Sequence, residues 1–381
     1  MRILQVIPYF TPRRGGDVNV CSNVAMQLSR LGHEVTIVTT DFELDRNLVN
    51  VVEGSGVKVV RFPVELNISL FLITPQMKRW MKREIKNFDI VHAHDSRTYQ
   101  NILVRKYAIR HRIPYIIQAH GSALPFLEKI WIKKLYDLIW GNSILRDAST
   151  LLAVAETEIG QYETAGARRD KIVLIPNGIE KARFSQSPAK GLFRKRIGID
   201  EAKKLILYQG RLHKRKGIDF LLDSFALMND KNCILTISGP DDGEKALLEE
   251  RSERLGVASR VKFTGFINNV SEAYVDADVV VYPASNEIFG LVPLEALLCG
   301  TQVIVADEGG CGDLIRKMNG GYLVRYGDII GLSQVMTHSL NHPEEGRKMI
   351  ENAKKYIINN LTWEKIATKI EESYENCIRD F

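Results

Sequence analysis

The feature that most constrains the fold is a regular alternation of short apolar runs with longer stretches of helical period. The chain opens with an apolar run from Ile3 to Ile7, a helical stretch from Asp17 to Leu31, and a second run from Glu34 to Thr39. This order and spacing predict a β–α–β unit. The alternation continues to Ala155 and resumes at Leu205. Strands that alternate with helices indicate α/β architecture, with parallel sheets covered on both faces.

The alternation is interrupted once, which predicts two domains. The interval from Glu180 to Asp200 is polar and rich in Lys and Arg, and it contains Pro188 and Gly191. A length of 381 residues also fits two doubly wound domains. Ligands of such sheets bind outside the carboxyl ends of the strands, so we expect the site in a cleft where two facing sheets meet.

Composition excludes several classes of protein. With 45% hydrophobic and 26% charged residues, the chain is typical of globular proteins. A net charge of +6 suits small anionic ligands or acidic lipid headgroups and is too low to indicate nucleic acid. The five cysteines are widely spaced, which favours a reducing compartment. No apolar stretch approaches the roughly 20 residues of a membrane span, and we expect no signal peptide and a cytoplasmic location.

Two glycine-containing loops follow predicted strands. Gly15 and Gly16 lie where a phosphate loop would be, although a tight turn is an equal alternative, and neither a dinucleotide fingerprint nor a Walker loop is present. The loop from Gly210 to Gly217 carries four cations. Such runs are commonly solvated surface, but this one follows a strand, where Arg211 and Lys216 would neutralise a diphosphate.

Two glutamates flank the start of a predicted helix near Leu291. Glu287 lies in the preceding loop and Glu295 one turn inside the helix, so both carboxylates can face the expected cleft beside the backbone N–H groups of residues 288–291. Acceptors and donors in this arrangement suit a polyhydroxylated ligand. The alternative is that Glu287 favours the helix N-terminus electrostatically while Glu295 forms a surface ion pair.

Taken together, these segments resemble the retaining GT-B glycosyltransferases of family 4, also called group 1 glycosyltransferases. The resemblance covers nearly the whole chain, and the order of its motifs is more specific than any one of them. The segments that carry it are Gly15-Gly16, Ala119-His120-Gly121, Ile175-Pro176-Asn177-Gly178, Gly210-Arg211, Lys216-Gly217, and Glu287 with Glu295.

The resemblance implies a role for each domain. Residues 1–180 would bind the acceptor, with a C-terminal helix at 363–381 packing back on them, and residues 181–362 would bind the nucleotide sugar. Arg211 and Lys216 would hold the diphosphate and stabilise the leaving group. The other implied donor contacts are Glu287 and the N–H groups of Phe289 and Gly290 at the sugar, Glu295 at the ribose, Gly265 and Phe266 near the nucleobase, and Gly16 at the phosphate or acceptor.

The resemblance also implies a mechanism. His120 would face the donor sugar, with a packed or capping histidine as its alternative. Retention by front-face substitution needs no carboxylate nucleophile. We also expect neither a metal nor a cofactor. The acidic pair Asp241-Asp242 fits a turn better than a metal site. UDP is the favoured nucleotide, with guanine and adenine open. The alternatives are an epimerase or phosphorylase of the same fold, or a non-catalytic nucleotide-sugar-binding protein.

Two stretches of the first domain combine apolar and basic residues. Each either rests on an anionic membrane surface, which would place the protein on the inner face of the membrane, or packs its apolar stripe on the sheet. We give the two options equal weight for the first stretch and favour packing for the second, Leu124 to Leu145, which contains Trp131 and Trp140. The cations of the first stretch are Lys78, Arg79, Lys82, Arg83 and Lys86.

Overall fold

The computed structural model divides the chain into two compact units, which are described separately. The first comprises Met1–Gly178 and Trp363–Phe381, and the second comprises Ile179–Thr362. The structure describes residues 1–13, 16–69, 71–124, 130–181, 184 and 188–381. Within this part of the chain, no helix is both long and apolar enough to cross a lipid bilayer.

The first unit is built on a seven-stranded parallel sheet of order β3-β2-β1-β6-β7-β8-β9, with a separate antiparallel hairpin, β4-β5. Its strands are β1 (Arg2–Val6), β2 (Glu34–Thr40), β3 (Lys58–Phe62), β4 (Leu66–Ile68), β5 (Phe71–Ile73), β6 (Ile90–His94), β7 (Tyr115–Gln118), β8 (Thr150–Ala153) and β9 (Ile172–Leu174). Its helices are α1 (Gly16–Arg30), α2 (Arg46–Glu53), α3 (Pro75–Glu84), α4 (Tyr99–His111), α5 (Ile130–Tyr136), α6 (Asn142–Asp147), α7 (Glu156–Thr164) and α17 (Trp363–Arg379), with the short 3-10 helices η1 (Ile85–Asn87) and η3 (Arg169–Lys171) and the π-helix η2 (Asp137–Gly141).

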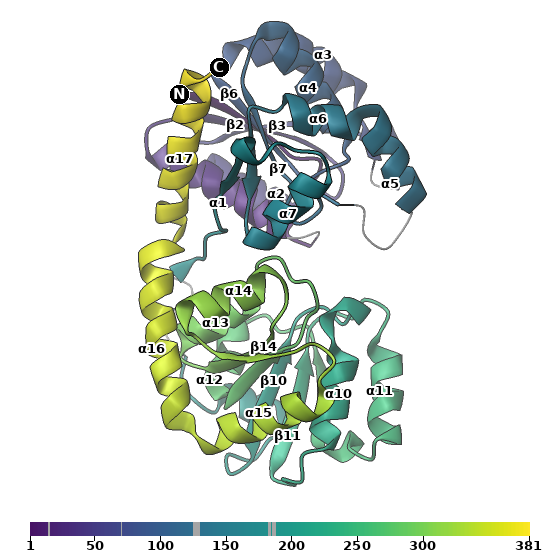
Figure 1. The fold of residues 1–381 in the computed structure, drawn as a ribbon, viewed down its shortest axis with the longest axis vertical. Coiled ribbons are helices and arrows are strands. Elements are labelled where there is room, and N and C mark those ends of the chain that lie inside the picture. The colour runs from purple at the N-terminus through teal and green to yellow at the C-terminus, as the bar shows by residue number, and fades with distance from the viewer. Residues whose placement is uncertain (14–15, 70, 125–129, 182–183, 185–187) are drawn as a thin grey trace. The chain divides into compact units, whose positions relative to one another are not determined.

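Helices cover both faces of this sheet because successive strand residues point to opposite sides. Leu4 and Val6 of β1 belong to the core beneath α3 and α4, whereas Ile3 belongs to the core beneath α1 and α17. Figure 1 shows α17, drawn in yellow, beside α1 near the chain's N-terminus. The last helix of the chain therefore completes the core of the first unit.

The second unit is a six-stranded parallel sheet of order β12-β11-β10-β13-β14-β15 (Figure 1). Its strands are β10 (Lys204–Gln209), β11 (Cys233–Ser238), β12 (Val261–Gly265), β13 (Val279–Tyr282), β14 (Gln302–Ala306) and β15 (Tyr322–Val324). Its helices are α9 (Leu192–Ile197), α10 (Ile218–Ala226), α11 (Lys245–Arg254), α12 (Val270–Asp276), α13 (Leu291–Cys299), α14 (Gly309–Met318), α15 (Ile329–Asn341) and α16 (Pro343–Asn360), with turns η4 (Lys214–Lys216) and η5 (Ala258–Arg260).

The order of the strands places the functional loops together. In each sheet the chain starts at a central strand, builds outward, and then returns to the other side of that strand, so β10 lies between β11 and β13. The loops after β10 and β13 therefore start side by side, at the carboxyl ends of two neighbouring strands. This is the switch point of the strand order, where such sheets bind ligands.

The strands that the sequence pattern did not indicate are short. The hairpin β4-β5 and the edge strands β9 and β15 have three residues per strand, which is too few to show a periodicity of two. The predicted runs at 3–7 and 34–39 and the predicted helical stretch at 17–31 correspond to β1, β2 and α1, with no end displaced by more than one residue.

Candidate active site

The loops after β10 and β13 pack closely against each other. Gly217 has φ +66°, and a Cβ at this position would lie 2.3 Å from the carbonyl oxygen of Pro283. The N–H of Ser285 donates to the carbonyl of Arg215 at 3.2 Å. A side chain at position 217 would push the loops apart, so the glycine lets the basic loop reach the residues that follow β13.

Lys216 and Glu287 meet where these loops join. Lys216 Nζ lies 2.5 Å from Glu287 Oε2, and the Tyr282 hydroxyl donates to the same oxygen at 2.9 Å. Lys216 Nζ also donates to the Tyr282 hydroxyl at 2.9 Å. Burial alone would raise the pKa of Glu287, but the Lys216 ammonium and the two hydrogen bonds hold it below its usual range. The cluster therefore contains a carboxylate and an ammonium, both charged and largely withdrawn from water.

Arg211 lies on the same loop but is exposed. Its guanidinium forms an ion pair with Asp242 at 3.2 Å, and its backbone carbonyl accepts from the Tyr208 hydroxyl at 3.0 Å. Burial raises the pKa of Tyr208, with the charge of Glu287 adding to the effect and that of Arg211 opposing it. The guanidinium is therefore paired with Asp242 rather than with Glu287.

The remaining predicted donor residues lie at the end of β12 and around the start of α13. The Tyr274 hydroxyl of α12 donates to Glu295 at 2.9 Å, so the two predicted glutamates have different tyrosine partners. Gly290, with φ +71°, precedes α13, and a Cβ there would lie 2.5 Å from Cys311 Sγ. Phe289 buries its ring, whereas Phe266, after Gly265 at the end of β12, is exposed.

Asp241 is a turn residue, as the sequence indicated. Its carboxylate accepts from the backbone N–H groups of Gly243, Glu244 and Lys245 before α11. These bonds lower the pKa of Asp241, with the N–H of Lys245 contributing most. The carboxylate thus caps the start of a helix.

In the first unit, His120 follows β7 in a left-handed backbone conformation with φ +51°. Asp95, which follows the neighbouring strand β6, is left-handed as well, with φ +66°. This conformation is costly for residues other than glycine, and it persists where surrounding contacts enforce it.

Three imidazoles stack behind the His120 turn. His94 Nδ1 lies 3.0 Å from His120 Nε2, and the His94 ring also stacks on His92 with centroids 4.3 Å apart. Burial lowers the pKa of His120 to about 4 and that of His92 to about 3, and burial together with its two histidine neighbours holds His94 well below its usual range. All three rings are therefore neutral at pH 7, and one nitrogen of the His94–His120 pair donates while the other accepts.

Helix α7 holds the His120 turn from both sides. The N–H of Gly121 donates to Glu158 Oε1 at 2.5 Å, and the N–H of Ala119 donates to the Tyr162 hydroxyl at 2.8 Å. Glu158 also accepts from the N–H of Val154 at 2.7 Å and is fully buried. Burial raises the pKa of Glu158 to about 7, against the opposing effect of its two N–H donors.

The start of α1 contributes a further carboxylate, that of Asp17, near the His120 turn. Asp17 is buried and shares a hydrogen bond with Asp95, whose pKa is raised chiefly by burial and then by Asp17. The charge of Asp17 also acts on His120. Gly16 begins α1, and a Cβ at this position would meet open space, so packing does not require the glycine. Its predicted partner Gly15 lies outside the described residues.

The two amphipathic stretches behave differently from each other. In α3 and the turn that follows, Met77, Met81 and Ile85 are buried and the five cations face outward, so its apolar stripe packs on the unit. The preference for packing was wrong for the second stretch. Trp131 and Leu138 are 72% and 75% exposed, and Ile130, Leu135 and Trp140 are exposed as well. Residues 125–129 of this stretch lie outside the described part.

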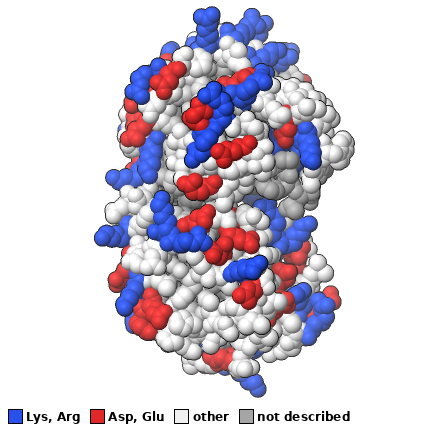
Figure 2. Space-filling view, in the orientation of Figure 1, with Lys and Arg blue, Asp and Glu red and all other residues white. Residues whose placement is uncertain are grey.

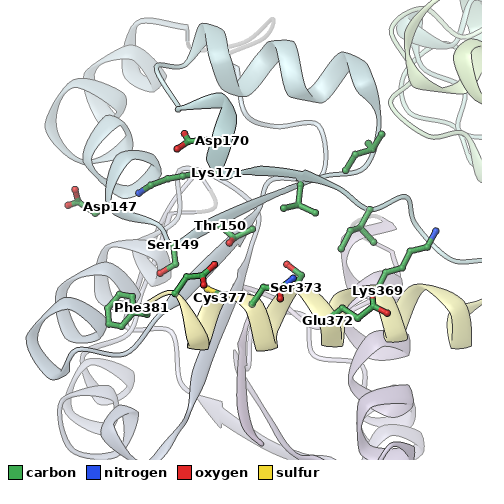
Figure 3. A pocket seen from close by; sticks show the side chains of 15 residues that line it. Asp147, Ser149, Thr150, Asp170, Lys171, Lys369, Glu372, Ser373, Cys377 and Phe381 are labelled. Atoms are coloured by element: carbon green, nitrogen blue, oxygen red, sulfur yellow. The ribbon is translucent and has the colours of Figure 1, made fainter.

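A hollow of about 570 Å³ lies elsewhere in the first unit, between α17 and the last strands of its sheet. Figure 3 shows Ser373 and Cys377 of α17 facing Ser149 and Thr150. Thr150 begins β8, whereas His120 follows the carboxyl end of β7. The lining of the hollow runs from the start of β8 to the end of β9 and includes none of His92, His94, His120 and Glu158, so the hollow is not part of the candidate active site.

Sequence analysis missed the residues that hold the predicted ones in place, namely Tyr282, Tyr274, His94 and Glu158. Tyr282 ends a buried strand and His94 ends another, positions that predict core packing. One signal was available for α7, because Glu158 and Tyr162 are four residues apart on one helix face directly after a strand.

Comparisons with known proteins agree with this architecture. Residues 190–356 match the family model of group 1 glycosyl transferases, and residues 14–183 match that of glycosyltransferase family 4. An uncharacterized glycosyltransferase of Methanocaldococcus jannaschii is 27% identical and covers 98% of both chains. N-acetyl-alpha-D-glucosaminyl L-malate synthase of Bacillus anthracis is 26% identical over 97% of this chain and 96% of its own.

Solved structures show the same fold. Anabaena HepE in complex with UDP has a TM-score of 0.82 and 20% identity, covering 99% of this chain and 100% of its own. Sucrose-phosphate synthase from Thermosynechococcus elongatus has a TM-score of 0.77 and 19% identity, covering both chains completely. The prediction of two doubly wound α/β domains is confirmed.

Proposed function

Because this chain is a family 4-like glycosyltransferase of the GT-B fold, we propose that it transfers a hexose-type sugar from UDP to a glycan, lipid-linked or small-molecule acceptor with retention of configuration. The observation that carries the proposal is the cluster of Lys216, Tyr282 and Glu287 beside the Arg211 loop. UDP is chosen because Anabaena HepE was solved with UDP and with UDP-glucose.

In this proposal the basic loop binds the diphosphate. As the bond between the anomeric carbon and the phosphate oxygen breaks, negative charge builds up on the leaving UDP, and Arg211 and Lys216 stabilise it. Because these two cations can neutralise the diphosphate without a metal ion, we include metal independence in the proposal. Lys216 is already ordered by Glu287 and Tyr282, which reduces the reorganisation needed when the donor binds.

The carboxylates would recognise hydroxyl groups. Glu287 is held as an ionised acceptor for a sugar hydroxyl, alongside the N–H groups of Phe289 and Gly290. Glu295, oriented by Tyr274, would accept from the ribose. Gly265 and Phe266 would lie near the uracil. The two hydrogen bonds on one oxygen of Glu287 weaken it as a nucleophile, which favours front-face substitution over a covalent intermediate.

The first unit would supply His120 and the acceptor site. A neutral imidazole can donate to or accept from a sugar hydroxyl but carries no charge to offset that of the phosphates. Gly16, with open space where a Cβ would stand, would allow the phosphate or the acceptor to approach the start of α1. The five free and buried cysteines favour the cytoplasm as the site of action.

The test is release of UDP from a panel of nucleotide sugars, with and without acceptor and chelator. We expect release from a UDP-sugar at a rate insensitive to chelator, and a loss of about 10²-fold or more in Lys216→Ala and Arg211→Ala, the scale of losing one preorganised charge partner. Lys214→Ala, a cation of the same loop, is the matched control. Loss of activity with chelator, or unchanged rates in both variants, would contradict the mechanism.

The same panel separates the alternatives. An epimerase would convert the sugar nucleotide without any acceptor, and a binding protein would be stabilised by UDP without turnover. In a thermal-shift measurement, a ligand at about 100 times its Kd adds about 2.7 kcal/mol to the free energy of unfolding. Stabilisation by GDP or ADP in place of UDP would overturn the choice of nucleotide.

A further inference from the structure

The outer face of the helical segment 130–139 in the first unit carries an exposed apolar stripe. Trp131, Leu135, Leu138 and Ile139 are 72%, 49%, 75% and 50% exposed. Their spacing of four, seven and eight residues brings them to one side of the segment, which continues from α5 into the π-helix η2. Ile130 and Ile132, beside them, are exposed as well. Large apolar side chains gathered in this way mark an interaction surface rather than ordinary solvent exposure.

The segment is anchored by its other face. The Tyr136 hydroxyl donates to the carbonyl of Thr98 at 2.9 Å, and Asp137 forms an ion pair with Arg97 at 2.8 Å. Tyr136 is buried, and its ring meets Phe71 of the hairpin edge to face, with centroids 6.1 Å apart. The segment therefore cannot roll over to bury the apolar stripe against its own unit.

The hairpin adds apolar surface next to this segment. Leu66 and Ile68 of β4 are about half exposed, and Ile68 is the cross-strand partner of Phe71. Cross-strand partners point to the same side of a hairpin. Ile68 therefore lies on the hairpin side that meets Tyr136, beside the base of the helical segment.

The hairpin leads directly into the basic helix. Helix α3 begins two residues after β5 and turns its cations outward, with Glu84 as the single acidic residue in its sequence. In Figure 2 the surface over α3 is blue with Lys and Arg, whereas few charged side chains are visible over α5. The hairpin packs on Tyr136 through Phe71 and leads into α3, so it connects the exposed apolar side chains with the cations on one unit.

We propose that this face of the first unit docks on an anionic lipid surface. The apolar stripe would enter the boundary between headgroups and acyl chains, and the cations of α3 would contact lipid phosphates. A symmetric contact between two copies of this face would bring the α3 cations of both chains together, and like charges disfavour it. An anionic lipid surface matches both the apolar and the cationic part of the face.

Vesicle flotation with the full chain tests the proposal. The vesicles are phosphatidylcholine alone or phosphatidylcholine with 30% phosphatidylglycerol, each at low and high salt. We expect the wild type to float with the anionic vesicles, and Leu138→Glu with Trp131→Ser to lower the partition coefficient at least tenfold at either salt concentration. Lys78→Glu with Lys82→Glu should abolish the preference for anionic vesicles. Leu247→Glu, a 59% exposed leucine of α11 in the second unit, is the control and should change partition less than twofold.

Several outcomes would overturn the proposal. The first is that the wild type does not float with the anionic vesicles. The second is that the double variant Leu138→Glu with Trp131→Ser floats as well as the wild type. The third is that Lys78→Glu with Lys82→Glu keeps the preference of the wild type for anionic vesicles. Sedimentation that shows a wild-type dimer dissociated by Leu138→Glu, with vesicle binding unchanged, would assign the apolar stripe to a second copy. Thermal melting of each variant verifies folding. Flotation does not depend on glycosyl transfer, so it tests this proposal separately from the proposed function.

Discussion

At the scale of single residues, the charge on Glu287 depends on two neighbours from different segments. Lys216 comes from the loop after β10, and Tyr282 ends β13. Residue chemistry and position after a strand singled out Lys216 and Glu287 from the sequence. Tyr282 has the pattern of a core residue, and its ring is indeed buried. Its hydroxyl bonds both charged groups, and the Lys216 ammonium also lies 5.3 Å from the centroid of its ring. The direction of that hydroxyl depends on the packing of both loops.

Replacing Tyr282 with Phe removes one hydroxyl and leaves the ring. Glu287 loses a donor and Lys216 loses an acceptor. A hydrogen bond to a charged group contributes about 1.5–3 kcal/mol, so we expect kcat/KM for the donor to fall about tenfold or more. Steady-state kinetics of UDP release measures the effect.

The matched control for this substitution is Tyr208→Phe. Its ring stacks on Tyr282 with centroids 6.5 Å apart, but its hydroxyl donates to the backbone of Arg211 rather than to Glu287. We expect a smaller loss in this variant. Equal losses in the two variants would mean that ring packing, rather than the hydroxyl on Glu287, controls the rate.

At the scale of elements, α7 enforces the unusual backbone of the His120 turn. Glu158 and Tyr162 bind the N–H groups on either side of His120. The family resemblance implied that His120 faces the donor sugar. It did not indicate how a left-handed histidine is held there, because the restraining groups come from a helix about 40 residues later in the chain.

Glu158→Gln tests this restraint. The amide has one acceptor oxygen, so either Gly121 or Val154 loses its partner, and we expect kcat to fall about tenfold while the affinity for UDP stays within twofold. Glu156→Gln, an exposed neighbour on the same helix, should leave kcat unchanged. An unchanged kcat in Glu158→Gln would show that the turn keeps its geometry without the carboxylate.

The same substitution predicts a change in the pH dependence of stability. The pKa of Glu158 is raised to about 7 in the folded state from 4.5, so its contribution to stability is fully present below pH 4.5 and is lost as the pH rises through about 7. At 1.36 kcal/mol per pKa unit, this amounts to about 3 kcal/mol. Urea unfolding gives the free energy of unfolding at pH 5 and at pH 8. We expect this free energy to fall less from pH 5 to pH 8 in Glu158→Gln than in the wild type. An equal fall in the two proteins would contradict the raised pKa.

At the scale of the whole molecule, the chain leaves the first unit at Gly178 and returns to it at Trp363. Trp363, Ile366, Ile370 and Tyr374 of α17 are buried in the same core as α1. A Cβ at Gly178 would overlap the Trp363 ring, so the glycine permits close contact where the chain leaves the unit and returns to it. The first unit is therefore complete only when the C-terminal helix has been added.

Ile370→Ala should destabilise the first unit selectively. The side chain is 1% exposed, and removing a buried isoleucine costs about 2–5 kcal/mol. In calorimetry we expect the transition of the first unit to shift to lower temperature, while the transition that UDP stabilises keeps its midpoint. Lys369→Ala, at the exposed neighbouring position, is the control. Equal shifts of both transitions would mean that the units unfold together.

The sequence by itself determined the α/β class, the two series of strands, and the cations and carboxylates that follow them. Those features depend on local periodicity and on chemistry that belongs to each residue type. The tertiary structure alone decided which hydroxyls and N–H groups hold these residues, and which amphipathic stretch turns its apolar side outward. A helical pattern shows that an apolar stripe exists, but whether the stripe is covered depends on neighbours distant in the chain. For α3 that neighbour is the core of the first unit, and for residues 130–139 we propose that it is a lipid surface.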